Sequence, residues 1–129
     1  MSQPEHVLQV ERALIGALLL DLDAIAAVSR LVRVDDLTDD GVAVIYSALL
    51  ALAAQGEAPT YVALSEELER RGVLEQVGGR RYLLEAAANA PLGYDPLQYA
   101  QILAALAAQR RAAELGGDAG HAGLDEDVR

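Results

Sequence analysis

The sequence predicts an all-α fold, a compact orthogonal bundle of about six short helices. First, apolar residues recur at spacings of three and four in successive segments, which places them on single helical faces. Second, residues that begin or end helices separate these segments. Third, no alternating run of apolar and polar residues is bounded by hairpin turns, as strands would require. At 129 residues, one domain with a single modest core is expected.

The opening helix, within residues 4–21, carries an apolar face and a second face of small residues that includes Gly16. Because a glycine inside a helix costs about 1 kcal/mol relative to alanine, Gly16 indicates a place where another helix approaches closely. The apolar stripe consists of Val7, Val10, Leu14, Ile15, Leu18 and Leu19. Asp21 or Asp23 can cap a second helix, which is expected to bury Ile25, Val28 and Leu31.

The third helix is predicted to be capped by Thr38 and to end at a left-handed Gly56. Its apolar stripe consists of Val42, Ile45, Leu49 and Leu52. A fourth helix starts at Pro59-Thr60 and ends at Gly72. Two carboxylate–arginine pairs at i,i+4 are expected on its surface, Glu66–Arg70 and Glu67–Arg71.

The fifth helix follows the glycine pair at 78–79 and stops at Pro91, and it carries Tyr82, Leu83 and Ala86. Asp95 as a cap with Pro96 at the first helical position predicts the start of a sixth helix. The helical domain is expected to span residues 1–115. Residues 116–129, rich in glycine and acidic side chains, are expected to form a disordered acidic tail.

The sixth helix is the candidate protein interface. Its apolar stripe consists of Tyr99, Ile102, Leu103 and Leu106, and it is widened by Ala100, Ala104, Ala107 and Ala108. The helix is therefore apolar around more of its circumference than one contact with a small core requires. A surface for a partner is one interpretation, and alanine acting only as a good helix former is the other.

Composition excludes several classes of protein. The chain has no cysteine, so disulfides and thiolate metal sites are ruled out. Its net charge is −10, and all ten basic side chains are arginines, which makes nucleic-acid binding a poor expectation. The apolar runs are too short for a membrane span, and no signal peptide opens the chain, so a cytoplasmic protein is expected.

No constellation predicts catalysis or cofactor binding. A P-loop requires a lysine, and the chain has none. The Gly-Gly-Arg-Arg run at 78–81 is better explained as a turn between helices than as a phosphate cradle, because no strand precedes it. The aspartates at 35, 36, 39 and 40 lack the spacing of a calcium loop and are better explained by helix capping. His6 and His121, the two imidazoles, are expected to be exposed.

Two segments resemble the N-terminal domain of bacterial replicative DNA helicases of the DnaB type. In residues 4–21, a proline, an acidic residue at Glu11 and the run Leu-Ile-Gly-Ala-Leu-Leu-Leu-Asp look like the opening helix of that family. The order of helix stops and starts from Glu66 to Tyr99 is also similar. The chain departs from the family at residues 37–42, where an aromatic pair and a basic run are usual, and after Leu115, where the family continues into a helical hairpin.

The resemblance implies a non-catalytic collar domain that supports assembly of helicase subunits and docks primase or a helicase loader during DNA replication. Its partners would be itself or other helicase subunits, and it would bind neither nucleic acid nor a membrane directly. The ATP and magnesium of the parent helicase would belong to a motor beyond residue 129, so no cofactor is expected in this chain. Two alternatives stay open, a free-standing adaptor or decoy that binds helicase or primase, and a small helical DNA-binding regulator.

Overall fold

The computed structural model describes the backbone of residues 3–90 and 95–123 and the side chains of 5–90 and 95–115. Helices and 3-10 turns make up the regular structure of this described part, which contains no strand, so the predicted all-α fold is confirmed. In chain order the elements are α1 (Gln3–Leu20), η1 (Leu22–Ala24), α2 (Ile25–Ser29), η2 (Val34–Asp36), α3 (Asp40–Ala54), α4 (Tyr61–Arg70), α5 (Gly79–Ala88) and α6 (Pro96–Gly123).

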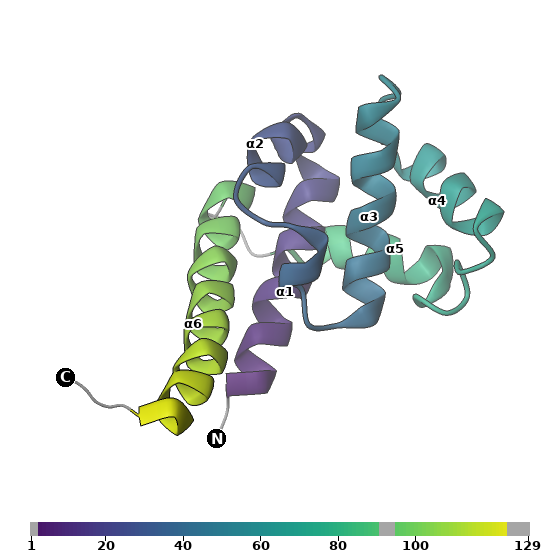
Figure 1. The fold of residues 1–129 in the computed structure, drawn as a ribbon. Helices are drawn as coiled ribbons and strands as arrows, with labels where there is room; N and C mark the ends of the chain where they lie inside the picture. Colours follow the sequence, from purple (N-terminus) through teal and green to yellow (C-terminus); the bar gives the residue numbers. More distant parts are fainter. Residues whose placement is uncertain (1–2, 91–94, 124–129) are drawn as a thin grey trace.

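Helix α1 lies at the centre of the bundle, with α6 along one side and α3 along the other (Figure 1). Helix α5 crosses α1 steeply and α4 packs on the outer side of α3, which gives the orthogonal arrangement. The core is aliphatic apart from Tyr46 and Tyr99. Its fully buried members include Leu14, Ile15, Leu18, Val28, Ile45, Leu49, Leu64, Leu68 and Leu83.

Gly16 brings α1 and α5 together, as its place on the small-residue face predicted. A Cβ atom at this position would lie 2.4 Å from the carbonyl oxygen of Ala86, so no side chain larger than hydrogen fits without movement of α5. Four other glycines end helices or form turns with positive φ, as expected, at Gly56, Gly72, Gly78 and Gly79.

Two of the predicted helix starts are confirmed. The hydroxyl of Thr60 accepts a hydrogen bond from the N–H of Ala63 at the start of α4. At the start of α6, the carboxylate of Asp95 accepts from the N–H of Gln98 at 3.0 Å, and the Gln98 side chain accepts from the N–H of Asp95 at 2.9 Å. This reciprocal pair explains why the helix begins where the Asp-Pro signal placed it.

Thr38 is not the cap of α3, contrary to the prediction. The carboxylate of Asp39 accepts from the N–H of Val42 at 3.0 Å and fills that role. The hydroxyl of Thr38 is instead a donor to the carboxylate of Glu11, 2.8 Å away on α1. A contact between residues far apart in the sequence thus shifts the helix start by one position.

Two further expectations are corrected. Leu31 is exposed rather than buried, because α2 ends at Ser29 and Val32 takes the core position. Arg70 pairs with Glu67 rather than with Glu66, and Glu67 is buried whereas Glu66 is exposed. The same Glu67 also binds Arg71 at 2.7 Å, as predicted.

The ends of the last two helices differ from the predicted ones. Helix α5 ends at Ala88, and the predicted stop at Pro91 lies outside the described residues. The backbone of α6 is helical to Gly123, so the helical end expected near Leu115 is too early. Extending an existing helix needs no new nucleus, which offsets part of the unfavourable propensity of its glycines. The rest of the expected tail, residues 124–129, lies outside the described part.

Candidate protein interface

Helix α6 divides the predicted interface residues between the core and the surface. Tyr99 and Leu103 are 7 % and 1 % exposed and pack in the core against α1, so they are closed to a partner in the folded chain. Ile102 is 39 % exposed, and Leu106 is half-buried against the core. Successive residues of a helix are turned by about 100°, which is why Ile102 points away from the face that holds Tyr99 and Leu103.

The outer face of α6 is rich in alanine and also carries the exposed glutamines Gln98, Gln101 and Gln109. Its exposed residues include Ile102, Ala105, Ala108, Ala112 and Leu115. Of the alanines expected to widen the stripe, Ala100 and Ala107 are buried, Ala104 is half-buried and Ala108 is exposed. Tyr99, Leu103 and Ala107 follow one another at a spacing of four residues, so this spacing alone could have indicated which side of α6 faces inward.

Glu11 joins α1 to the beginning of α3. Its side chain is fully buried, and its carboxylate accepts three hydrogen bonds, from the N–H and the hydroxyl of Thr38 at 2.7 and 2.8 Å and from the N–H of Asp39 at 3.0 Å. These donors lie at the N-terminus of α3, where the helix dipole favours a negative charge. Glu11 therefore has a structural role, and only the family resemblance had singled it out.

Asp36 is a second buried carboxylate, and its partners could not be predicted from the sequence. It is 4 % exposed and accepts from Arg111 Nη1 at 2.7 Å and from the N–H of Arg33 at 2.9 Å. Burial by itself raises the pKa of Asp36, but these two donors and the nearby positive charges outweigh it, so the pKa lies below its ordinary value. Burial is the larger cause, and the charge of Asp36 the smaller one, that together raise the pKa of Tyr46 to about 12.

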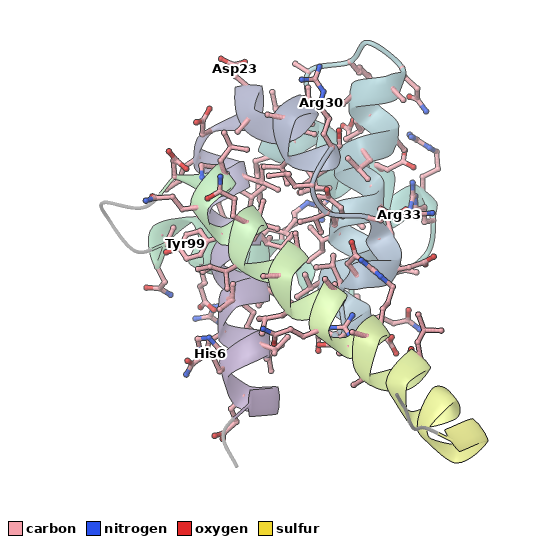
Figure 2. All side chains as sticks on the ribbon, turned by 60° about the vertical axis from the view of Figure 1, so that its left-hand side comes forward. His6, Asp23, Arg30, Arg33 and Tyr99 are labelled. Carbon is pink, nitrogen blue, oxygen red and sulfur yellow. The ribbon has the colours of Figure 1, made fainter. Side chains whose placement is uncertain are left out.

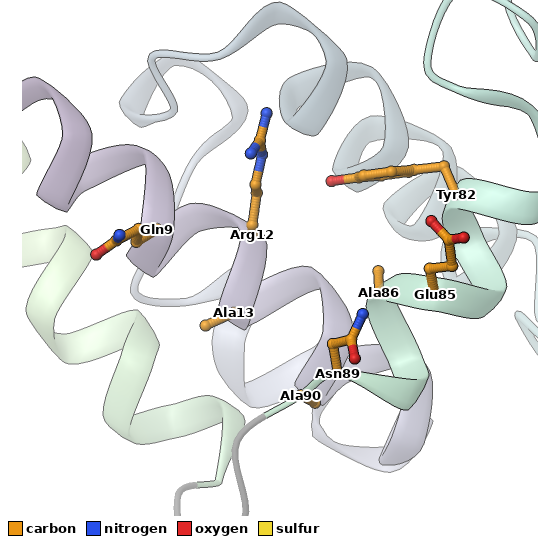
Figure 3. A pocket seen from close by; sticks show the side chains of 8 residues that line it. All are labelled: Gln9, Arg12, Ala13, Tyr82, Glu85, Ala86, Asn89 and Ala90. Atoms are coloured by element: carbon orange, nitrogen blue, oxygen red, sulfur yellow. The ribbon is translucent and has the colours of Figure 1, made fainter.

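A groove of about 310 Å³ lies between α1 and α5 (Figure 3). Its floor consists of Ala13, Ala86 and Ala90, and the small size of these residues follows from the close approach of the two helices at Gly16. Polar side chains form the rims, Gln9 and Arg12 on α1, Tyr82 and Glu85 on α5, and Asn89 at the C-cap of α5. The Tyr82 hydroxyl points toward Arg12, and burial raises the pKa of Tyr82 although Arg12 opposes the rise.

The groove is lined by one basic and one acidic side chain, Arg12 and Glu85. The carboxylate of Glu85 lies 3.3 Å from Arg81 in an exposed ion pair. The carboxylate of Asp39, near Tyr82, is used as the cap of α3. The guanidinium of Arg12 is exposed beside the apolar floor and is the charge that a partner entering the groove would meet.

The positions considered for chemistry have structural explanations. Gly78 and Gly79 have φ values of 111° and 73°, as the interpretation of a helix-to-helix turn predicts. Within the described part of the chain, no group of His, Cys, Asp or Glu side chains is arranged to hold a metal ion. His6 is exposed on α1 (Figure 2), whereas the side chain of His121 lies outside the described residues. No helix among the residues described is long and apolar enough to cross a membrane.

Comparison with known proteins identifies the domain. The chain is 36 % identical over 114 residues to the replicative DNA helicase DnaB of Mycobacterium leprae (strain TN), covering 88 % of this chain and 19 % of that helicase. It is 34 % identical to the replicative DNA helicase DnaB of Leifsonia xyli subsp. xyli (strain CTCB07), covering 88 % of this chain and 25 % of the relative. The chain therefore spans a quarter or less of the length of these two curated relatives.

The fold has a close counterpart among solved structures. The crystal structure of the N-terminal domain of DnaB helicase from Mycobacterium tuberculosis superposes with a TM-score of 0.79 at 34 % identity, covering 92 % of this chain and 86 % of that one. Residues 3–105 match the family described as the DnaB-like helicase N terminal domain. With the helical order, the buried Glu11 and these matches in agreement, the chain belongs to the family of DnaB-like helicase N-terminal domains.

Proposed function

We propose that this chain acts as a non-catalytic collar domain in DNA replication, which supports the assembly of helicase subunits and docks primase or a helicase loader. The observation that carries the proposal is the pair of exposed aliphatic side chains on the outer face of α6, Ile102 and Leu115, with exposed alanines between them. A partner that covers exposed apolar surface removes it from water, which stabilises the complex by about 25 cal/mol per Å². A cytoplasmic location agrees with this role.

The relatives support the link to a motor. Two of them are named replicative DNA helicases, and this chain matches only 19 % and 25 % of their lengths. In a parent protein of this kind, ATP and magnesium would be bound by the remaining part, and this domain would contribute assembly and docking. Tight binding of ATP to this chain in a calorimetric titration would contradict the proposal.

Subunit pairing through α6 is tested by light scattering over a concentration series. Substituting Ile102 with Asp places a charge on the exposed face, and we expect it to lower the apparent mass at high concentration. Val62→Asp is the matched control, because Val62 is an exposed apolar residue on α4. Circular dichroism of each variant checks that the helices are retained. A mass that is the same for wild type and Ile102→Asp at all concentrations would refute pairing through this face.

The groove between α1 and α5 is the candidate dock for primase or a loader. It combines an apolar floor with Arg12 at its rim, so an acidic side chain next to a small apolar one would fit its chemistry. We expect Arg12→Ala to weaken binding of such a partner about tenfold, which corresponds to about 1.4 kcal/mol. Arg30→Ala removes the same charge from the exposed C-cap of α2 and should leave the affinity unchanged. Equal effects of both variants would argue against the groove.

The free-standing adaptor would use the same two surfaces without a motor of its own. A reading frame that continues from Arg129 into a P-loop domain would favour the helicase subunit, and a stop codon would favour the adaptor. Direct DNA binding is disfavoured by the net charge of −10. A flat fluorescence anisotropy trace with duplex DNA at low salt is the expected result.

A further inference from the structure

Helix α6 continues well beyond the core that holds its first half. Among the α6 side chains that the structure describes, Ala107 is the last buried one, and those of 108–115 are exposed except for the half-buried Arg110. The backbone stays helical to Gly123. At about 1.5 Å per residue, residues 108–123, which we term the arm, extend for about 24 Å past Ala107.

One polar cluster ties the arm to the body of the domain. Arg111 Nη1 donates to the buried carboxylate of Asp36 at 2.7 Å, and Arg110 Nη2 donates to the backbone carbonyl of Asp36 at 2.9 Å. The other carboxylate oxygen accepts from the N–H of Arg33 at 2.9 Å, which orients the Asp36 side chain. We term Asp36, Arg110 and Arg111 the clamp.

The geometry of the clamp is suited to fixing the direction of the arm. Two donors on consecutive residues of α6 reach two different acceptors of one residue in η2, so the helix is held against rotation as well as against lifting. Asp36 is itself held in place, because η2 is a single turn packed against α3 and the N–H of Leu37 donates to the carbonyl of Val34 at 3.1 Å. Without the clamp, a tilt of about 15° at Ala107 would move the tip of the arm by roughly 6 Å.

We propose that the clamp is a positioning device that sets the direction of the arm relative to the rest of the domain. The two arginines restrain a helix segment whose described side chains, those of residues 108–115, are not buried in the core as the first half of α6 is. The biological purpose of this positioning rests on the proposed function. If the outer face of α6 pairs subunits, the direction of the arm sets the angle between the two paired subunits. The positioning itself is independent of that purpose.

The direction of the arm can be measured by electron paramagnetic resonance between two spin labels. The chain has no cysteine, so Ala53→Cys and Ala113→Cys supply the only two labelling sites, one exposed on α3 and one exposed on the arm. The labelled chain is diluted with unlabelled chain, which suppresses distances between molecules. We expect Arg110→Gln combined with Arg111→Gln to broaden the distance distribution or to shift its mean by about 2 Å, the movement that a 15° tilt produces about 9 Å past Ala107.

Two controls separate positioning from general loosening. In the same clamp variant, labels at Ala53→Cys and Gln101→Cys report the core-packed half of α6, and their distance should not change. The double variant Arg80→Gln with Arg81→Gln removes the same two charges from exposed ion pairs on α5 and should leave both distances unchanged. The proposal is overturned if the distance to residue 113 is unchanged in the clamp variant, if the distance to residue 101 changes equally, or if the α5 variant has the same effect.

Hydrogen exchange gives a second readout. Amides of residues 108–115 should exchange about tenfold faster in the clamp variant, while amides of α1 and α3 keep their rates. Equal acceleration throughout the domain would mean that the arginines only add global stability, and this would overturn the proposal. Light scattering on the same variant separates the positioning proposal from the proposal that subunits pair through α6. If the arm moves but the mass does not change, pairing through α6 is contradicted and the positioning proposal stands.

Discussion

Replacing Glu11 with Gln is the sharpest test of how this fold is held together. The substitution keeps the shape of the side chain and removes the charge that faces the start of α3. The single carbonyl oxygen of the glutamine can serve the two Thr38 donors, which both reach one carboxylate oxygen at 2.7 and 2.8 Å. Its NH₂ group would then face the N–H of Asp39, which now donates to the other oxygen at 3.0 Å. Two donors would be opposed inside the protein.

The expected loss of stability follows from two contributions. A hydrogen bond to a charged acceptor contributes about 1.5–3 kcal/mol to stability. A negative charge at a helix N-terminus contributes about 0.3–1 kcal/mol at the surface and up to about 2 kcal/mol when partly buried. We therefore expect Glu11→Gln to lower the free energy of unfolding by about 2–4 kcal/mol, out of a total of about 5–15 kcal/mol for a domain. For a chain of this size, Tm should fall by roughly 10 °C.

Thermal unfolding followed by circular dichroism at neutral pH measures this loss. Glu57→Gln is the control, because it removes the same charge from an exposed loop between α3 and α4. Folding also removes the charged carboxylate from water, and a neutral side chain avoids that free-energy penalty. If Glu11→Gln lowers Tm no more than Glu57→Gln does, the avoided penalty is as large as the loss of the hydrogen bonds. That result would refute the reasoning.

Three further outcomes follow from the packing and the buried polar groups. Gly16→Ala should lower the free energy of unfolding by about 1–3 kcal/mol in urea titrations despite its better helix propensity, because the new Cβ atom would overlap the Ala86 carbonyl, and a gain in stability would refute the close approach. Tyr46→Phe should cost about 1 kcal/mol in the same assay, since its hydroxyl donates to the Val32 carbonyl at 2.7 Å, and an unchanged urea midpoint would contradict this. The lowered pKa of Asp36 adds stability that is present above the ordinary pKa of an aspartate and is lost as pH falls through the lowered pKa. Asp36→Asn should therefore flatten the acid side of a profile of Tm against pH. Parallel profiles for the variant and the wild type would refute this prediction.

The helices themselves could largely be predicted from the sequence. The cap of α4 at Thr60 and the reciprocal cap of α6 at Asp95 and Gln98 involve residues within three positions of each other. Such bonds depend on local backbone geometry, so sequence patterns predict them well. The prediction failed at Thr38 because Glu11, far away in the sequence, competes for its hydroxyl and its N–H.

The candidate interface could be predicted only in part. The apolar character of α6 was evident from its composition, but the stripe of Tyr99, Ile102, Leu103 and Leu106 combined inward and outward residues. Which of these face α1 depends on the rotation of α6 about its axis, and packing decides that rotation. Arg110 and Arg111 gave no signal at all, because their acceptor in η2 lies more than seventy residues earlier in the chain.

The amino-acid sequence by itself determined the helical class, the order of the helices, most of their starts and the requirement for a glycine at position 16. Only the tertiary structure decided which face of α6 is left for partners, that Glu11 anchors α3, and that Asp36 holds the arm. The physical reason is range. Helix caps and periodicity arise from neighbours along the chain, whereas the burial of a carboxylate and the choice of its donors depend on where distant segments cross.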